Sequence, residues 1–276
     1  MSKRNNWDNK QSARDRLRAE RERQAKKDKT RRQLLVGGGV VAVLAIAAGI
    51  GVAVSQLGGG GGSAHWTAAA DKTLVKPANT AGDQGTQVVI GDKNAKHTLE
   101  IYQDMRCPIC SVFEQNVGDT IGKDIKDGKF KVQYTIGTFL DKGFGGTGSK
   151  AALSALGAAL NVSPQAFSDY NKALYAKDNH PEETKDSYSS TDTLLKVADQ
   201  VPALKDNAQF QKNVKDGTFD KWALEMSATF DKAKDVSGTP TIKLDGKKIE
   251  VDSPNGKGAP MTPEQFNQAI DPLLKS

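Results

Sequence analysis

The stretch Gln103-Asp104-Met105-Arg106-Cys107-Pro108-Ile109-Cys110 holds the only two cysteines of the 276-residue chain, spaced as Cys-x-x-Cys. It follows residues 98–102, a β-branched and aromatic run typical of a strand. It precedes residues 111–125, whose apolar positions recur at helical spacing. The pair is therefore predicted to lie at a strand-to-helix junction, with Cys107 at the start of the helix.

Three kinds of site use a Cys-x-x-Cys. A zinc site needs about four ligands, but the chain has no further cysteine and its three histidines are scattered at His65, His97 and His180. A structural disulfide closing so short a ring would stabilise little. A redox pair fits best, because unpaired N–H groups at a helix N-terminus lower the pKa of a thiol there.

Position predicts the role of each cysteine. Cys107, at the helix start and the more exposed of the two, is expected to be the thiolate that forms a mixed disulfide with a substrate. Cys110 lies one turn inside the helix and is expected to resolve it. Pro108 lies where its missing N–H costs nothing.

A second motif, Val236-Ser237-Gly238-Thr239-Pro240-Thr241, comes directly before a hairpin pattern with an Asp245-Gly246 turn. A proline that opens a strand marks an edge or a special turn. On position alone, an ordinary loop with a trans Thr239–Pro240 bond is the favoured interpretation.

The remaining patterns predict an α/β domain over residues 87–276. Strands are expected at 88–91, 98–102 and 129–136, and a helical block at about 146–234 precedes the hairpin of 241–244 and 248–251. The last helix is expected to begin at Thr262-Pro263, where a threonine cap precedes a proline suited to the first turn and Gln265 completes a capping box.

These motifs together resemble the thioredoxin superfamily, and most closely its DsbA-like disulfide oxidoreductases in a membrane-tethered bacterial form. The resemblance covers roughly residues 85–276 and rests on the two cysteines, the inserted helical block and the Gly-Thr-Pro-Thr before the hairpin. It implies a thioredoxin fold with an inserted helical domain and a cis Thr239–Pro240 bond. It also implies that Thr239 and Pro240 pack beside Cys107 and offer backbone to a bound substrate chain.

Two positions depart from that family. Many members carry a histidine where this chain has Ile109, which can offer neither charge nor hydrogen bond to the thiolate. The buried acid six residues before the first cysteine is replaced by Ile101, and the neighbouring Glu100 points to the other face of a regular strand. Either a bulge realigns Glu100 or this proton acceptor is missing. Asp104 and Arg106 could tune the thiolate in opposite directions, or could be solvated loop charges.

The region before the domain predicts membrane attachment. Residues 1–32 hold 13 Lys and Arg against five acids, whereas the other 244 residues hold 26 and 28, so the basic charge is local and does not indicate a nucleic-acid-binding face. Residues 34–54 are apolar throughout and long enough to span a bilayer. An uncleaved signal anchor over 34–55 is expected in place of a cleaved signal peptide, whose apolar region is shorter.

This arrangement predicts a cytoplasmic tail (1–33), a single-pass anchor, a flexible Gly-rich linker (56–86) expected to be loop over 64–86, and a catalytic domain outside the cytoplasm. The chain is expected to be a thiol–disulfide oxidoreductase that needs no cofactor or metal. It would act on exported cysteine-containing proteins and be recycled by a membrane redox partner. A reductase or isomerase, and a non-catalytic binding module on the same fold, remain alternatives.

Overall fold

The computed structural model of the chain describes residues 60–82, 85–253 and 256–275. The predicted basic tail and signal anchor lie outside these residues. Among the helices within them, none combines the length and the apolar character needed to cross a membrane.

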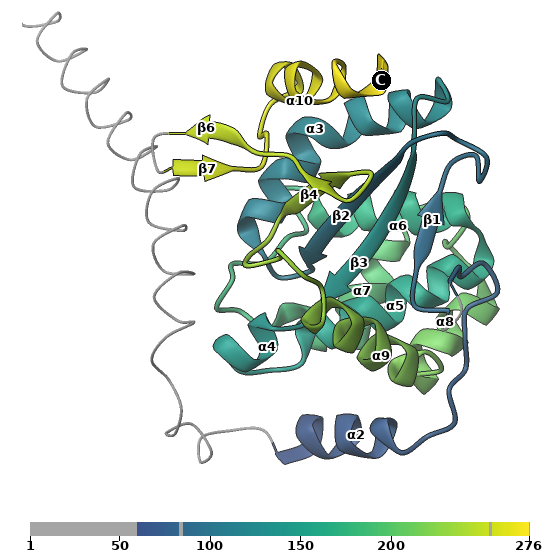
Figure 1. Cartoon of the computed structure of the whole chain (residues 1–276). Coiled ribbons are helices and arrows are strands. Elements are labelled where there is room, and N and C mark those ends of the chain that lie inside the picture. The colour runs from purple at the N-terminus through teal and green to yellow at the C-terminus, as the bar shows by residue number, and fades with distance from the viewer. Residues whose placement is uncertain (1–59, 83–84, 254–255, 276) are drawn as a thin grey trace, which may run out of the picture. The chain divides into compact units, whose positions relative to one another are not determined.

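A five-stranded mixed sheet forms the centre of the domain, in the order β1-β3-β2-β4-β5 (Figure 1). The pair β2 and β3 is parallel, and β1, β4 and β5 each run antiparallel to their neighbour. The strands are β1 (Val88–Ile90), β2 (Thr98–Asp104), β3 (Lys131–Gly137), β4 (Thr241–Leu244) and β5 (Lys247–Lys248), and a separate hairpin comprises β6 (Val251–Ser253) and β7 (Gly256–Gly258).

The helix after the cysteines and the last helix fall within a few residues of their predicted positions, and the helical block is present, whereas the sequence pattern does not predict α2 (Gly60–Ala70) or α4 (Leu140–Gly143). The other helices are α3 (Pro108–Lys126), α5 (Gly148–Val162), α6 (Pro164–Tyr175), α7 (Thr191–Ala198), α8 (Ala208–Asp216), α9 (Asp220–Asp231) and α10 (Pro263–Ile270), with 3₁₀ turns η1 (Ser187–Ser189) and η2 (Leu273–Lys275). The cap of the last helix is confirmed, since the Thr262 hydroxyl accepts a hydrogen bond from the Gln265 N–H.

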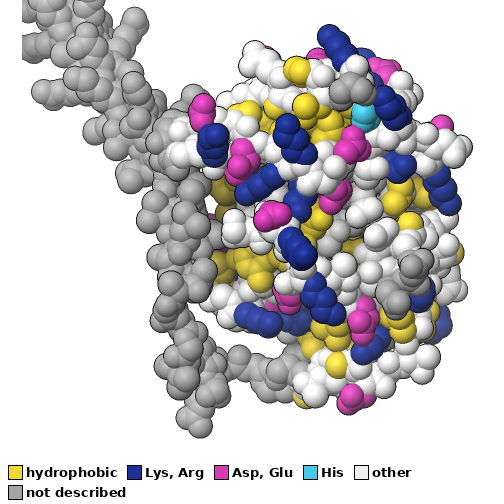
Figure 2. Space-filling view, in the orientation of Figure 1, with side chains coloured by type: hydrophobic (Ala, Val, Ile, Leu, Met, Phe, Trp, Pro, Cys, Tyr) yellow, Lys and Arg dark blue, Asp and Glu magenta, His cyan; other side chains and the backbone are white. Residues whose placement is uncertain are grey.

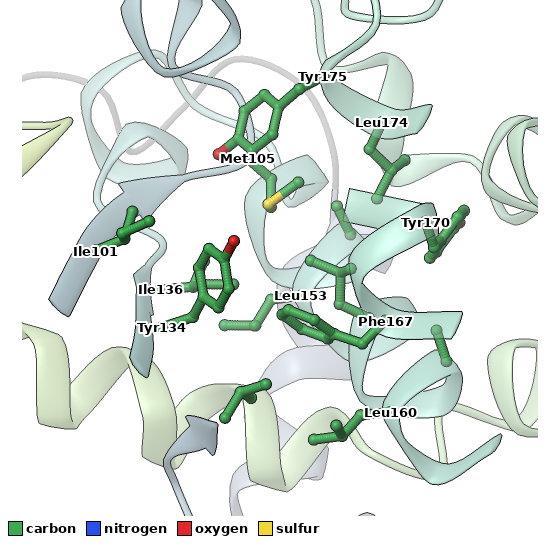
Figure 3. Packing of buried hydrophobic residues seen from close by; sticks show 14 of the residues in the cluster. Ile101, Met105, Tyr134, Ile136, Leu153, Leu160, Phe167, Tyr170, Leu174 and Tyr175 are labelled. Atoms are coloured by element: carbon green, nitrogen blue, oxygen red, sulfur yellow. The ribbon is translucent and has the colours of Figure 1, made fainter. Parts of the chain in front are cut away.

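Helices pack on both faces of the sheet, and consecutive residues in the second halves of β2 and β3 are accordingly buried. Tyr134 of β3 contacts Phe167 of α6 on one face, with ring centroids 5.5 Å apart (Figure 3). Tyr102 of β2 meets Phe230 of α9 on the other face at 6.2 Å. The sheet is therefore buried on two sides, and α5 to α9 all lie between β3 and β4 in the sequence, as the predicted helical block requires.

The expectation of loop over residues 64–86 is wrong for its first part, because α2 forms there and packs on the domain. Trp66 and Ala69 are buried. His65 lies 2.7 Å from Asp220 of α9, and the Lys221 amine donates to the carbonyl of Ala70 (Figure 1). The run of alanines has high helix propensity, and these contacts with α9 supply the packing that the sequence pattern does not reveal.

The surface of the described residues carries both signs of charge. On the face shown in Figure 2, Lys and Arg side chains alternate with Asp and Glu, and apolar patches lie between them. This mixture follows from the nearly balanced charge count of residues 33–276.

Candidate redox site

Cys107 is the N-cap residue of α3, three residues after Asp104 at the end of β2. Its backbone is extended, with φ −74° and ψ 116°, and its Sγ accepts a hydrogen bond of 3.4 Å from the N–H of Cys110. Pro108 occupies the first turn, where no N–H partner is needed. The predicted strand-to-helix junction is confirmed, and both cysteines are free thiols in this structure.

The two thiols differ in acidity. The hydrogen bond with the Cys110 side chain lowers the pKa of Cys107, helped by Thr239 and the Cys110 N–H and opposed by burial. Burial raises the pKa of Cys110 well above its usual value, and so does the neighbouring Cys107 sulfur. Cys107 is therefore the more acidic thiol of the pair.

Exposure distinguishes the cysteines less than the sequence suggested. Cys107 is 4% exposed and Cys110 1%, so Cys107 is the more exposed of the two, as expected, but both thiols are buried. The difference in acidity between the two thiols comes from hydrogen bonding at Cys107 and from burial at Cys110.

The Thr239–Pro240 peptide bond is cis, as the resemblance implied. The Cys107 Sγ lies 3.5 Å from the carbonyl oxygen of Thr239. The sheet produces this approach, because Tyr102 near the end of β2 pairs with Thr241 at the start of β4. Two motifs 132 residues apart in the chain thus form one site.

Asp104 lies three residues before Cys107 and is fully buried. Its carboxylate accepts hydrogen bonds from the Ser149 hydroxyl at 2.6 Å and from the N–H groups of Arg106 and Leu140. Burial raises the pKa of Asp104 to about 6, although these hydrogen bonds act in the opposite direction. Its negative charge in turn raises the pKa of Cys107.

Arg106 is fully buried as well, so the alternative of solvated loop charges is wrong for both residues. One guanidinium nitrogen lies 3.1 Å from Asp141 and 3.3 Å from Asp186. The other donates to the carbonyl of Glu183 at 2.9 Å. Arg106 thereby fastens the turn before Cys107 to the inserted helical block.

The other two predicted modulating residues lie apart from this network. Glu100 accepts a hydrogen bond of 2.7 Å from the Tyr102 hydroxyl, on the sheet face opposite Ile101. β2 pairs in regular register with both neighbours, so no bulge turns Glu100 toward the cysteines. Ile109 is half-buried against the apolar core.

Sequence reasoning missed two residues near the pair. The Tyr175 hydroxyl donates a hydrogen bond of 2.9 Å to the carbonyl of Asp104, and Figure 3 shows its ring beside Met105. Glu114 is buried on α3, one turn beyond Cys110. An acid at the i+4 position of an apolar helix face could have revealed Glu114, whereas nothing local marks Tyr175.

Metal ligands do not gather in the part of the chain that the structure describes. No three His, Cys, Asp or Glu side chains there come together in a way that could hold an ion.

The arrangement of the dithiol site suits thiol–disulfide exchange. It places an acidified sulfur at a helix N-terminus, a buried thiol one turn away, and a backbone carbonyl beside the first sulfur.

Comparison with known proteins agrees with this reading of the fold. A family model described as Thioredoxin matches residues 83–272. Disulfide bond formation protein D of Bacillus subtilis is 26% identical over 164 residues, which cover 59% of this chain and 70% of the relative.

Solved structures give the same architecture. Oxidised DsbA of Mycobacterium tuberculosis has a TM-score of 0.56 at 21% identity, covering 69% of this chain and 93% of its own. Oxidised BdbD of B. subtilis also scores 0.56 at 21% identity, with 73% and 100% covered. MdbA, a thiol-disulfide oxidoreductase of Actinomyces oris, scores 0.57 at 21% identity, with 71% and 88% covered. The family match spans most of the chain and the structures share its fold, so the chain belongs to the thioredoxin family, with a DsbA-like architecture.

Proposed function

We propose that this chain is a membrane-tethered thiol–disulfide oxidoreductase that oxidises exported proteins through Cys107 and Cys110. The observation that carries the proposal is the opposite pKa shift of two thiols one helical turn apart, with the Thr239 carbonyl 3.5 Å from the first sulfur. The relatives whose names state disulfide bond formation or thiol-disulfide oxidoreductase activity support it.

The exchange takes place in two steps. A substrate thiolate attacks Cys107 in the Cys107–Cys110 disulfide, a mixed disulfide forms, and Cys110 leaves as a thiolate that takes up a proton. A second thiolate of the substrate then attacks the substrate sulfur of the mixed disulfide. A disulfide forms between the two substrate sulfurs, and Cys107 leaves as a thiolate. The enzyme gains the two electrons that the substrate loses.

The direction of exchange depends on the relative stability of the dithiol and disulfide forms. A lowered pKa at Cys107 stabilises the dithiol form, and a stabilised dithiol makes the disulfide a stronger oxidant. This favours an oxidase over the reductase and isomerase alternatives. Ile109 adds nothing to that stabilisation, so the oxidising strength rests on Cys110 and Thr239.

The place of action follows from the sequence of the first 55 residues. The anchor over residues 34–54 would hold the domain outside the cytoplasm, with the basic tail inside. There the substrates are exported cysteine-containing polypeptides, and a redox protein of the same membrane would reoxidise the dithiol.

The test of activity uses a reduced, unfolded protein whose own activity requires disulfides. The oxidised enzyme is expected to restore that activity, and the Cys107→Ser variant is expected to restore none. Full activity of a variant lacking both cysteines would favour the binding module instead.

A second test addresses attachment. The full-length chain is expected in the membrane fraction, with Cys107 alkylated by a membrane-impermeant maleimide added to intact cells. Deletion of residues 34–54 is expected to remove it from that fraction. Alkylation only after cell lysis would contradict the proposed orientation.

A further inference from the structure

Tyr175, the last residue of α6, is a fully buried side chain of the inserted helical block that reaches the dithiol site. None of the exchange steps above uses it. Its hydroxyl donates a hydrogen bond of 2.9 Å to the main-chain carbonyl of Asp104, the last residue of β2. Figure 3 shows the ring beside Met105, the next residue along the chain. A buried phenol needs a partner for its O–H group, so this bond fixes the end of the Tyr175 side chain.

The carbonyl that accepts this bond belongs to the turn that places Cys107. The N–H of Cys107 donates to the same Asp104 oxygen at 3.0 Å. A bond from the N–H of residue i+3 to the carbonyl of residue i closes a β-turn, here over residues 104–107. The phenol of Tyr175 therefore holds the turn at the oxygen that closes it.

The main-chain carbonyl of Tyr175 holds the other side of the cysteine pair. It accepts hydrogen bonds from the Ser111 hydroxyl at 2.8 Å and from the Gln115 side-chain amide at 2.9 Å. Ser111 directly follows Cys110, and its own N–H donates to the carbonyl of Cys107 at 3.1 Å. Tyr175 thus bonds to the chain before Cys107 through its hydroxyl and to the chain after Cys110 through its carbonyl.

The phenol keeps its proton while the sulfurs change charge. Burial raises the pKa of Tyr175 well above its usual value, and negative charge on Cys110 or Cys107 acts in the same direction. The hydroxyl therefore remains a donor to Asp104 in every state of the cysteine pair. The influence of both sulfurs on the phenol also shows that the ring lies close to them.

The contacts of the Cys107 sulfur depend on how the turn meets α3. The N–H of Cys110 donates to this sulfur at 3.4 Å, and the carbonyl oxygen of Thr239 lies 3.5 Å from it. Both Cys110 and Thr239 lower the pKa of Cys107. A hydrogen bond weakens steeply when its angle departs from linear, so a tilt of the turn against α3 would weaken these contacts.

The other buried groups of the turn hold it on one side of the pair. The carboxylate of Asp104 is bonded to Ser149, and the guanidinium of Arg106 is bonded to Asp141. Neither of these partners lies on α3. Tyr175 connects the turn with the first turns of that helix.

We propose that Tyr175 is the positioning residue of the dithiol site, which fixes the turn before Cys107 against the helix after Cys110. It acts through the main chain and touches no substrate atom. The proposal rests on the proposed dithiol chemistry and names the residue of the inserted block that keeps the two sulfurs in the arrangement that exchange requires.

The test measures the acidity of Cys107 in the reduced full-length chain. Iodoacetamide reacts with a thiolate and not with a thiol, so the rate of alkylation at Cys107 reports the ionisation of that sulfur. The rate is followed by mass spectrometry of the Cys107 peptide from about pH 3 to about pH 9.

Tyr175→Phe keeps the ring and the main-chain carbonyl and removes the hydroxyl alone. The pKa of Cys107 is expected to rise by about one unit, which is a tenfold loss in its acid dissociation constant. The disulfide of this variant should also become a weaker oxidant, by about tenfold in its equilibrium with glutathione.

The matched control is Tyr170→Phe. Tyr170 is a fully buried residue of the same helix whose hydroxyl also donates to a main-chain carbonyl, that of Leu194, at 2.8 Å. Its substitution removes the same group and one buried hydrogen bond without touching the turn or α3. Melting curves should show similar losses for the two variants, whereas the Cys107 profile of Tyr170→Phe should match the wild type.

Ser111→Ala tests the other end of the arrangement and gives an answer even where Tyr175→Phe fails to fold. It removes one of the two donors to the Tyr175 carbonyl, and Gln115 remains. The pKa of Cys107 is expected to rise, by less than in Tyr175→Phe.

The proposal is overturned by a Tyr175→Phe profile that coincides with the wild type, by an equal shift in Tyr170→Phe, or, where Tyr175→Phe does not fold, by an unchanged pKa in Ser111→Ala. Alkylation needs no protein substrate, so it answers for Tyr175 separately from the oxidation of exported proteins. A wild-type Cys107 that titrates like a free cysteine, near about 8.5, would instead contradict the proposed function itself.

Discussion

The Ser149 hydroxyl of α5 donates a hydrogen bond of 2.6 Å to the buried carboxylate of Asp104 at the end of β2. Asp104, a titratable residue three positions before Cys107, is thereby bonded to the inserted helical block. The charge of Asp104 raises the pKa of Cys107. The acidity of the exchanging thiol therefore depends on a network that the insertion supplies.

Asp104 should make stability increase as the pH falls. Its folded-state pKa is about 6 against 3.8 unfolded, so between those values the folded state binds more protons and is favoured at lower pH. From pH 8 to pH 5 the gain from this group is about 1 kcal/mol. Urea unfolding at the two pH values should show a smaller change in the Asp104→Asn variant than in the wild type. An identical change in both proteins would contradict the assignment.

Replacing Cys110 with serine should trap the mixed disulfide. The Cys107 thiolate still attacks, but no neighbouring thiol is left to resolve the adduct. Incubation with an oxidised protein substrate is expected to give a covalent complex on a non-reducing gel. The reducing agent dithiothreitol should release it, and Cys107→Ser should form none. A complex formed equally by Cys107→Ser would show that Cys110 is the attacking residue.

Replacing Ile109 with histidine should acidify Cys107 and strengthen the oxidant. A histidine can donate a hydrogen bond or charge to the thiolate, which the half-buried isoleucine cannot. We expect the pKa of Cys107 to fall by about one unit, equivalent to about 30 mV in the potential of the couple. Thiolate absorbance against pH gives the first quantity and equilibrium with glutathione gives the second. A rise in the pKa would show that the position faces away from the sulfur.

Replacing Arg106 with methionine should destabilise the domain by about 3–5 kcal/mol. Loss of the guanidinium breaks a buried ion pair: Asp141 keeps only Lys150 as a charged partner, and the carbonyls of Gly145 and Glu183 lose the donor that Arg106 supplies. Lys123→Gln is the matched control, because Lys123 forms an ion pair that is largely exposed, and exposed pairs add little. Guanidinium unfolding compares the two variants. Equal stability of both would mean that the buried network contributes nothing.

Replacing Trp66 with alanine should free α2 from the domain. The side chain is 8% exposed, and full burial of a large apolar group is worth about 1.5–3 kcal/mol. The rate of amide hydrogen exchange in residues 64–70 is expected to rise by the factor equivalent to this loss of free energy, and protease cleavage there is expected to increase. Amides of α3 serve as the internal control and should exchange as in the wild type. Unchanged exchange in α2 would show that His65 and Lys221 hold the helix alone.

The sequence suffices for features whose cause is local. A β-branched and aromatic run predicts β2, and alternation of polar and apolar residues predicts β3. The apolar stripe predicts α3, and the Thr262 cap is encoded within four residues. The position of Cys107 at a strand-to-helix junction follows from those neighbours. The meeting of Cys107 with Thr239 required the family resemblance, because no local pattern joins segments 132 residues apart.

Features that depend on distant partners escaped sequence reasoning. In the sequence, Asp104 and Arg106 resemble solvated loop charges. Only the fold brings Ser149, Asp141 and Asp186 into contact with them. The docking of α2 depends on Asp220 and Lys221, which lie about 155 residues further on. Burial of charge is decided by which elements meet, and the spacing of residues along the chain does not contain that information.

The separation of Cys107 from Thr239 bears on how a growing chain acquires its site. Chains are made from the N-terminus, and Cys107 and Cys110 emerge with α3 long before β4. Until β4 pairs with β2, nothing holds the Thr239 carbonyl at the first sulfur. A nascent or truncated chain ending before residue 241 would therefore lack the contribution of Thr239 to the acidity of Cys107, and the site is complete only when the central sheet is complete.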